Sequence, residues 1–194
     1  MGKTDSTDAD KAIDLDFTGV FRLADLKPEP PPPPPRRIPP DILIGVRDLA
    51  EGNYFVNVTR PRPARTVDPK KTTILIVEDD LPTLNMLDLL LSRVAGYQTR
   101  RARDVQTFVQ AMQKTPRADA VILDVGLPGN VSGFKILAKI RTHPALRNLP
   151  VIMFSGHTAP EYLLEGLSLG ADAYLSKPAK SQAIFDALKI VLGG

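Results

Sequence analysis

The stretch Ala120-Val-Ile-Leu-Asp-Val-Gly-Leu-Pro-Gly129 decides the predicted fold of this chain of 194 residues. Its first four residues are apolar, as in a strand that is buried on both faces of a sheet. The strand ends in a carboxylate, Asp124, and the glycines and proline after it predict a loop. Open α/β sheets carry their chemistry at the carboxyl ends of parallel strands, so Asp124 is the first candidate site residue. Taken alone, this position also fits a turn residue or a helix cap.

On both sides of this stretch, short apolar runs alternate with helical stripes. The predicted strands are residues 72–77, 97–102, 120–123, 149–154 and 173–175. Each is followed by apolar residues at helical spacing, such as Leu84, Leu87 and Leu91 after the first strand. Five such units predict an α/β fold with a doubly wound, five-stranded parallel sheet of order 2-1-3-4-5, flavodoxin-like, in three αβα layers.

Local signals mark where the helices begin and end. Asp80 is the expected N-cap of the first helix, because Pro82 is tolerated only in a first turn. Thr158-Ala-Pro-Glu161 is the expected capping box of the helix after the fourth strand. Gly96 and Gly170 are expected to end the helices that precede them.

Composition excludes several classes of protein. The chain has no cysteine, which excludes disulfides and thiolate metal sites and favours a reducing compartment, so a cytoplasmic location is expected. No apolar run approaches the ~20 residues of a membrane span, so membrane insertion is not expected. The net charge is +3, and the one tight basic group in the second half is Arg100, Arg101 and Arg103. A solvated strand edge or helix start explains these three arginines better than a nucleic-acid patch, so no nucleic-acid partner is expected.

Residues 1–70 are predicted to be a proline-rich N-terminal extension or linker, largely disordered, before a domain at residues 71–194. Nine of the thirteen residues from Pro28 to Pro40 are proline, which favours polyproline II; a stiff spacer and a ligand for an aromatic groove both fit. Tyr54 to Val58 is expected to be a strand, as the second half of a hairpin that starts at Asp41. Such a segment cannot form a core alone. Disorder, return to the main domain and docking to a partner all stay open.

The ends of the predicted strands bring polar groups to one rim of the sheet. The first, third, fourth and fifth strands end at Glu78 and Asp79, Asp124, Ser155 and Lys177. In a sheet of this order the first and third strands flank the topological switch point. Carboxylates crowded there would repel by ~4 kcal/mol per pair at 4 Å and an effective dielectric constant of ~20. A divalent cation relieves this repulsion, and an all-oxygen site suits Mg²⁺. With a lysine and a hydroxyl beside it, such a site suits phosphoryl transfer to a carboxylate.

These motifs resemble the receiver domain of bacterial two-component response regulators. The resemblance covers residues 71–194 and rests on five motifs in register: Ile74-Leu-Ile-Val-Glu-Asp-Asp80, Leu123-Asp-Val-Gly-Leu-Pro128, Phe154-Ser-Gly156, Gly170-Ala-Asp-Ala-Tyr174 and Ser176-Lys-Pro178. Two departures stand beside the site. The loop Gly129-Asn-Val-Ser-Gly133 is one residue longer than usual, and Gly156 stands where alanine is common; both bear on the lifetime of a phosphoryl group.

The resemblance implies a role for each site residue. Asp124 would be the phosphoacceptor. The metal ligands for Mg²⁺ would be Glu78, Asp79, Asp124 and the backbone carbonyl of Gly126. The phosphate-binding and switch residues would be Ser155, Lys177 and Tyr174. His157 is a candidate modulator of dephosphorylation only by its place just past Ser155, and an exposed side chain without a functional role is the favoured interpretation. Tyr174 is equally consistent with ordinary packing on the last strand.

The predicted function is a phosphorylation-dependent signalling switch, not an enzyme with external substrates. A histidine kinase or a histidine phosphotransfer protein would supply the phosphoryl group, and an unidentified downstream protein would read the altered surface, with a phosphorylation-dependent dimer left open. No output domain is expected after the receiver. A haloacid-dehalogenase-type phosphatase is disfavoured, because the second aspartate that it needs is replaced by Gly126. The alternative is a scaffold or adaptor that acts mainly through the proline-rich N-terminal arm.

Overall fold

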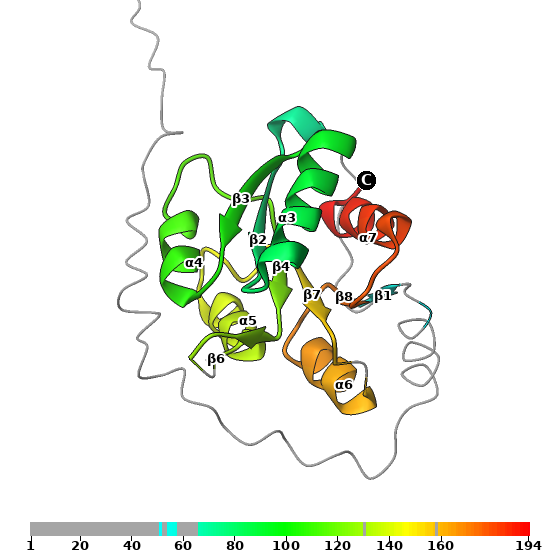
Figure 1. Ribbon diagram of the computed structural model, residues 1–194. Helices are drawn as coiled ribbons and strands as arrows, with labels where there is room; N and C mark the ends of the chain where they lie inside the picture. The colour runs from blue at the N-terminus through cyan, green and yellow to red at the C-terminus, as the bar shows by residue number, and fades with distance from the viewer. Residues whose placement is uncertain (1–50, 52–53, 58–65, 130, 158) are drawn as a thin grey trace, which may run out of the picture.

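The computed structural model describes residues 51, 54–57, 66–129, 131–157 and 159–194. Five parallel strands make up most of its main sheet: β2 (Thr73–Val77), β3 (Gln98–Ala102), β4 (Ala120–Asp124), β7 (Val151–Ser155) and β8 (Ala173–Ser176). Their order is β3-β2-β4-β7-β8, which is the predicted order 2-1-3-4-5 and confirms the flavodoxin-like fold (Figure 1).

A sixth strand, β1 (Tyr54–Val56), extends the sheet beyond β8 and runs antiparallel to it. A strand at this place is predicted, but as half of a hairpin with a segment from Asp41, which lies outside the described residues. The observed partner is β8, with Phe55 opposite Tyr174 and Val56 opposite Ala173. The sheet therefore has six strands rather than five, because the unpaired backbone groups at the edge of β8 accept a strand from the segment assigned to the extension.

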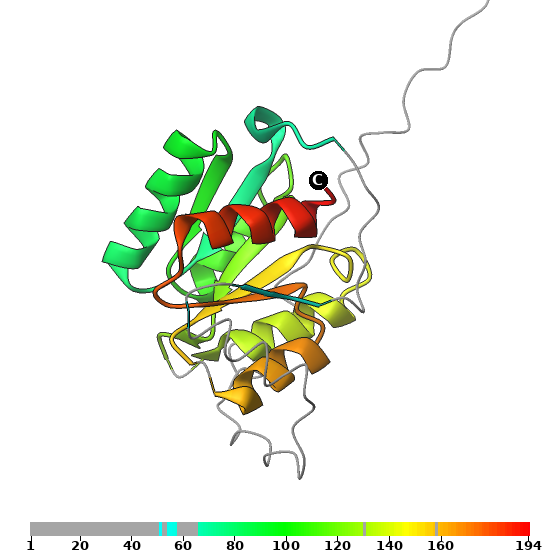
Figure 2. The same cartoon turned by 90° about the vertical axis from the view of Figure 1, so that its right-hand side faces the viewer.

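Helices cover the two faces of the sheet unequally (Figures 1 and 2). One face packs against α3 (Leu81–Leu89), which continues through a π turn at η3 (Leu90–Val94), and against α7 (Ser181–Leu192). The other face packs against α4 (Val105–Met112), α5 (Gly133–Thr142) and α6 (Pro160–Ser168). A short helical turn, η2 (Pro69–Lys71), precedes β2, and a small hairpin of β5 (Gly126–Leu127) and β6 (Val131–Ser132) follows β4.

Strand β4 is buried along its whole length, as its apolar run predicts. Its side chains alternate between the two halves of the core. Ile122 packs with α3 and α7, whereas Val121 and Leu123 pack with α4, α5 and α6. Because both faces are covered, the polar end of the strand at Asp124 is held in a fixed position at the rim.

The predicted helix ends are confirmed in most places. Asp80 caps α3 by accepting a hydrogen bond from the Thr83 N–H at 2.9 Å, and Gly96 and Gly170 have the positive φ of helix-ending glycines. The capping box at the start of α6 is a wrong prediction: the N-cap is Ala159, without a side-chain hydrogen bond, and Thr158 lies outside the described residues. Across the described ranges, no helix is both long and apolar enough to cross a membrane.

Candidate functional site

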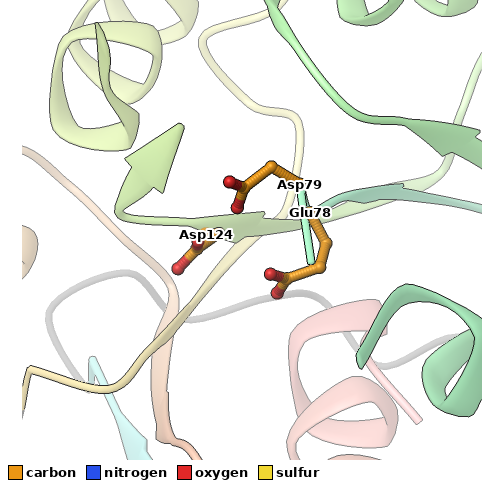
Figure 3. Close-up of side chains that lie close together, drawn as sticks. All are labelled: Glu78, Asp79 and Asp124. Carbon is orange, nitrogen blue, oxygen red and sulfur yellow. The ribbon is translucent and has the colours of Figure 1, made fainter. Parts of the chain in front are cut away.

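Three carboxylates meet at the carboxyl edge of the sheet (Figure 3). Glu78 and Asp79 directly follow β2, and Asp124 is the last residue of β4. The two strands are neighbours, with Val77 opposite Leu123, so their ends lie side by side. Each residue offers one carboxylate oxygen, and these oxygens all lie within 4.8 Å of one another. The predicted acidic cluster is therefore present in the structure.

Lys177, from the loop after β8, binds two of these carboxylates. Its Nζ lies 2.6 Å from Glu78 Oε2 and 3.1 Å from Asp124 Oδ1. The same ammonium lies 5.3 Å from the centre of the Phe154 ring, within the range of a cation–π contact. Only 23% of the Lys177 side chain is exposed, so its ammonium group interacts mainly with the carboxylates and little with bulk water.

Burial makes this cluster costly to ionise. It raises the pKa of the Glu78 carboxyl above its ordinary 4.5, and the hydrogen bond with Lys177 offsets part of the rise. Burial likewise raises the pKa of Asp124 above its ordinary 3.8, against the lowering effect of Lys177 and of the Val125 and Gly126 backbone N–H groups. One lysine therefore only partly compensates the buried carboxylates.

The donor set fits a hard divalent cation. All three side chains supply oxygen atoms, which is the chemistry that Mg²⁺ prefers. Glu78 Oε2 is fully buried, and its contact among the described residues is the charge-assisted one with the Lys177 ammonium at 2.6 Å. A buried carboxylate with spare acceptor capacity in an acidic cluster is a suitable ligand for a cation.

Ser155, His157 and Tyr174 form a second group beside the cluster. Ser155 is the last residue of β7 and is 1% exposed; its Oγ accepts a hydrogen bond from the His157 N–H at 3.0 Å. The phenol of Tyr174 donates to the His157 backbone carbonyl at 3.0 Å, and burial raises the pKa of that phenol. Tyr174 is 0% exposed, so its ring belongs to the core. The His157 imidazole stacks on Tyr162 of α6, with 4.4 Å between ring centres.

The loop after Asp124 turns back as a hairpin and packs against the end of β4. Gly126 pairs with Ser132 across β5 and β6. Gly133, the first residue of α5, donates its N–H to the Val125 carbonyl at 2.7 Å. A Cβ on Gly133 would lie only 2.0 Å from the Asp124 carbonyl oxygen. The start of α5 and the end of β4 can therefore approach this closely only where residue 133 is glycine.

Two features of this edge were not predicted from the sequence. The contact of Gly133 with Asp124 had a visible signal, since a glycine that begins a helix soon after a buried strand suggests close approach of two backbones. Arg103, just after β3, donates from Nη2 to the backbone carbonyl of Asp79 at 3.1 Å. Its place after a strand end was a weaker signal, because many arginines at such positions are only solvated.

The fold and this edge define a flavodoxin-like protein with an acidic site at its topological switch point. The family model described as the response regulator receiver domain matches residues 74–189. This chain therefore belongs to the receiver domain family of response regulators. A curated relative, the transcriptional regulatory protein GltR of Pseudomonas aeruginosa, is 37% identical over 120 residues, which are 62% of this chain and 48% of that protein. The chain thus spans about half the length of the curated relative.

Solved structures agree with this family. One is the signal receiver domain of a signal transduction histidine kinase from Syntrophus aciditrophicus, at 31% identity and a TM-score of 0.57, covering 63% of this chain and 91% of that one. Another is the receiver domain of the sensor histidine kinase PA1611 from Pseudomonas aeruginosa, described with a magnesium ion coordinated in its active site cleft. It is 26% identical, has a TM-score of 0.56 and covers 63% of this chain and 98% of that one.

Proposed function

We propose that this chain is a phosphorylation-dependent switch in which Asp124 accepts a phosphoryl group from a histidine kinase or a histidine phosphotransfer protein. One observation carries the proposal: four strand ends bring Glu78 and Asp79, Asp124, Ser155 and Lys177 to one edge, with Lys177 3.1 Å from Asp124. A structural cap or turn would need none of these partners. The family to which the chain belongs favours the same function.

In the proposed reaction a carboxylate oxygen of Asp124 forms a bond to phosphorus while the bond between phosphorus and the donor nitrogen breaks. Lys177 holds Asp124 Oδ1 and leaves the other carboxylate oxygen for attack. As negative charge builds on the phosphoryl oxygens, the Lys177 ammonium can follow them, since its other partner, Glu78, lies on the same rim. Charge stabilisation and positioning supply most of the catalysis of such transfers.

The ligands of a Mg²⁺ ion would be Glu78, Asp79, Asp124 and the backbone carbonyl of Gly126. The three carboxylates already lie within reach of one point, and the related PA1611 receiver domain is described with magnesium in its active site cleft. When bound, the ion would neutralise carboxylate and phosphoryl charge. Glu78 and Asp79 would in turn keep the ion beside the acceptor oxygen.

Phosphorylation of Asp124 would change the nearby protein surface through three residues, Ser155, Tyr174 and His157. The Ser155 hydroxyl is proposed to bond to a phosphoryl oxygen, which would release its contact with the His157 N–H. Tyr174 is tied to the same loop through the His157 carbonyl and would follow that movement. His157 is proposed to modulate hydrolysis of the phosphoryl group, because its backbone is bonded to both Ser155 and Tyr174.

The readout would be a protein contact on the side of α6, β8 and α7, in a receiver domain of residues 71–194 that follows the extension 1–70. The protein would act as a phosphoacceptor that assists its own Mg²⁺-dependent phosphorylation and dephosphorylation, in the cytoplasm. The alternative function, an adaptor that works through the proline-rich arm, depends on residues 28–40, which lie outside the described residues.

Intact mass spectrometry tests the proposal. With Mg²⁺ and acetyl phosphate, the wild-type chain should gain one phosphoryl group, and Asp124→Asn should gain none. Asp186→Asn, a matched change in α7, should be modified as the wild type is. An unmodified wild type, or a modified Asp124→Asn chain, would contradict the assignment.

A further inference from the structure

The strand β1 is held against β8 by more than its three ladder residues. The Asn57 N–H donates to the Asp172 carbonyl at 2.9 Å. The Asn57 side-chain amide donates to the Ala171 carbonyl at 2.9 Å and reaches the Leu167 carbonyl at 3.5 Å. Asn57 is only 7% exposed. Because the buried Asn57 amide is hydrogen-bonded, β1 is fixed to β8 by a specific interaction rather than by a loose surface contact.

The two faces of β1 contact different parts of the core. Phe55 packs into the cluster of α4, α5 and α6, and its partner in the ladder is Tyr174, a member of that cluster. Directly opposite residues in an antiparallel pair have side chains on the same face, so Phe55 lies beside Tyr174. Tyr54 and Val56 pack on the other face, with the cluster of α3 and α7.

A continuous set of contacts leads from β1 to the phosphoacceptor edge. Phe55 lies beside Tyr174, whose phenol donates a hydrogen bond to the His157 carbonyl. The His157 N–H donates a hydrogen bond to Ser155 Oγ. Ser155 is the last residue of β7, the neighbour of β4, which carries Asp124. The position of the Tyr174 ring is therefore shared between the edge strand and the Ser155 loop.

We propose that phosphorylation of Asp124 strengthens the docking of the chain's own segment Tyr54–Asn57 on the edge of β8, and that Tyr174 transmits the effect. The inference rests on the proposed function of Asp124. A phosphoryl group that draws Ser155 toward itself leaves more room for the buried Tyr174 ring. Phe55 packs beside that ring in its buried position, so each event favours the other.

The coupling is reciprocal, because two events that favour the same state must favour each other equally. Docking of β1 therefore raises the affinity of the Asp124 site for a phosphoryl mimic by the factor by which the mimic favours docking. A factor of about five or more is typical of coupled sites. Because residues 1–53 are covalently continuous with β1, phosphorylation of Asp124 would change how firmly the N-terminal extension is anchored to the receiver domain.

The first test is hydrogen exchange on the full-length wild-type chain with Mg²⁺, with and without beryllofluoride. Backbone amides at residues 54–57 should exchange about fivefold more slowly, or slower still, with beryllofluoride. Unchanged or faster exchange there would overturn the inference. Phosphorylation of the same protein by acetyl phosphate without beryllofluoride, measured by mass, separates the two proposals: a chain that is phosphorylated, but shows no protection of residues 54–57 with beryllofluoride, retains the proposed function and loses the coupling to β1.

The second test exploits the absence of cysteine from the chain. Val56 and Ala173 are opposite each other across β1 and β8, and paired positions on adjacent strands lie within the reach of a disulfide. The Val56→Cys/Ala173→Cys chain should oxidise to a monomeric cross-linked form that binds beryllofluoride, measured by calorimetry, at least about fivefold more tightly than its reduced form. Failure to cross-link, or cross-linking between two chains, would contradict docking within one chain.

A matched pair of variants locates the path of the coupling. In the cross-linked chain, Phe55→Ala should remove the gain in beryllofluoride affinity, because Phe55 lies on the Tyr174 side. Tyr54→Ala should retain the gain, because Tyr54 packs on the other face. Equal loss in both variants would exclude the route through Tyr174.

Discussion

At the scale of single residues, the site depends on how one lysine is shared. Lys177 contacts Glu78 and Asp124 at short range, and both carboxylates are nearly buried. The lysine is thus a structural counter-charge in the resting protein and the proposed phosphate ligand in the active one. These two roles compete, because a phosphoryl group on Asp124 would draw the Lys177 ammonium away from Glu78.

Replacing this lysine should be expensive for the resting protein. In Lys177→Met, at pH 7 without Mg²⁺, the free energy of unfolding should fall by about 3 kcal/mol, because two buried carboxylates lose their partner. Urea unfolding measures the change. The exposed Lys189→Met in α7 is the control and should change stability by less than about 0.5 kcal/mol. Added Mg²⁺ should restore part of the loss in Lys177→Met; equal stability of the two variants would contradict the role of the ion pairs.

The methyl group added by Gly133→Ala should displace the backbone at Asp124. Gly133→Ala would place a Cβ 2.0 Å from the Asp124 carbonyl oxygen and 3.1 Å from Val125 Cα. The backbone must shift, at a cost of about 1–3 kcal/mol, and phosphorylation should become slower. Gly156→Ala is the control, since nothing lies within 4 Å of its new Cβ. Rates of phosphorylation by acetyl phosphate, followed by mass, check the prediction, and equal rates in both variants would refute it.

At the scale of elements, Arg141 joins the end of α5 to the far edge of the sheet. Its guanidinium donates to the Gly170 carbonyl at 2.7 Å, to the Leu149 carbonyl at 2.8 Å and to Asp172 Oδ2 at 2.8 Å. The same Asp172 oxygen accepts the Val151 N–H. One ion pair therefore fixes the entry into β7 and β8, at the end of the sheet opposite Asp124.

This ion pair should be costly to break and cheaper to remove whole. Arg141→Met should lower the free energy of unfolding by about 3–5 kcal/mol, because the buried Asp172 carboxylate loses its ion pair with the guanidinium. The double variant Arg141→Met/Asp172→Asn should lose less than the sum of the single changes. A double-mutant cycle by urea unfolding measures the difference, and strictly additive losses would contradict a direct coupling.

At the scale of the whole molecule, the acidic cluster sets how stability changes with pH. The pKa values of Glu78 and Asp124 are raised in the folded state, chiefly by burial. The native chain therefore holds protons that the unfolded chain has already released. This contribution is present at low pH and is lost as pH rises from the ordinary values of 4.5 and 3.8 through the raised ones.

Without Mg²⁺, the contribution of this cluster to the free energy of unfolding should therefore decrease as pH rises above the ordinary values of 4.5 and 3.8. Saturating Mg²⁺ should flatten the slope, because the cation favours the ionised carboxylates. Glu78→Gln, which removes one of the two groups, should also have a smaller slope. Asp80 and Asp104 act in the opposite direction, since hydrogen bonds from Thr83 and Thr107 lower their pKa values below 3.8, outside this range. A slope that is the same with and without Mg²⁺ would argue against a metal at these carboxylates.

Local patterns predicted most of this fold because its determinants are local. The apolar run before Asp124, the cap at Asp80 and the stripe of Leu84, Leu87 and Leu91 each act within a few residues. Right-handed crossovers restrict the order of the parallel strands, and 2-1-3-4-5 is one of the common doubly wound orders that obey them. The convergence of Glu78, Asp79, Asp124 and Lys177 was predictable as well. Each of these residues lies at the carboxyl end of a strand whose position in the sheet was predicted.

Features that depend on contacts distant in sequence were not predictable. Tyr54 to Val56 alternates like any half-buried strand, and nothing in the alternation distinguishes β8 from a neighbouring hairpin as its partner. The close approach of Gly133 to Asp124 depends on how the hairpin of β5 and β6 folds back. The start of α6 at Ala159 without a side-chain cap shows that a capping motif is only one way to begin a helix.

The seat of β1 also bears on solubility. Without β1, strand β8 would present Ala173, Tyr174 and Leu175 along an open edge, and an apolar open edge recruits strands from other molecules into aggregates. At the opposite edge, β3 has Arg100 and Arg101, and charges of this kind discourage edge-to-edge association. The sheet is thus protected by charge on one side and by a short strand of its own chain on the other. Shortening the extension past Asn57 would remove the second protection and favour self-association of the receiver domain.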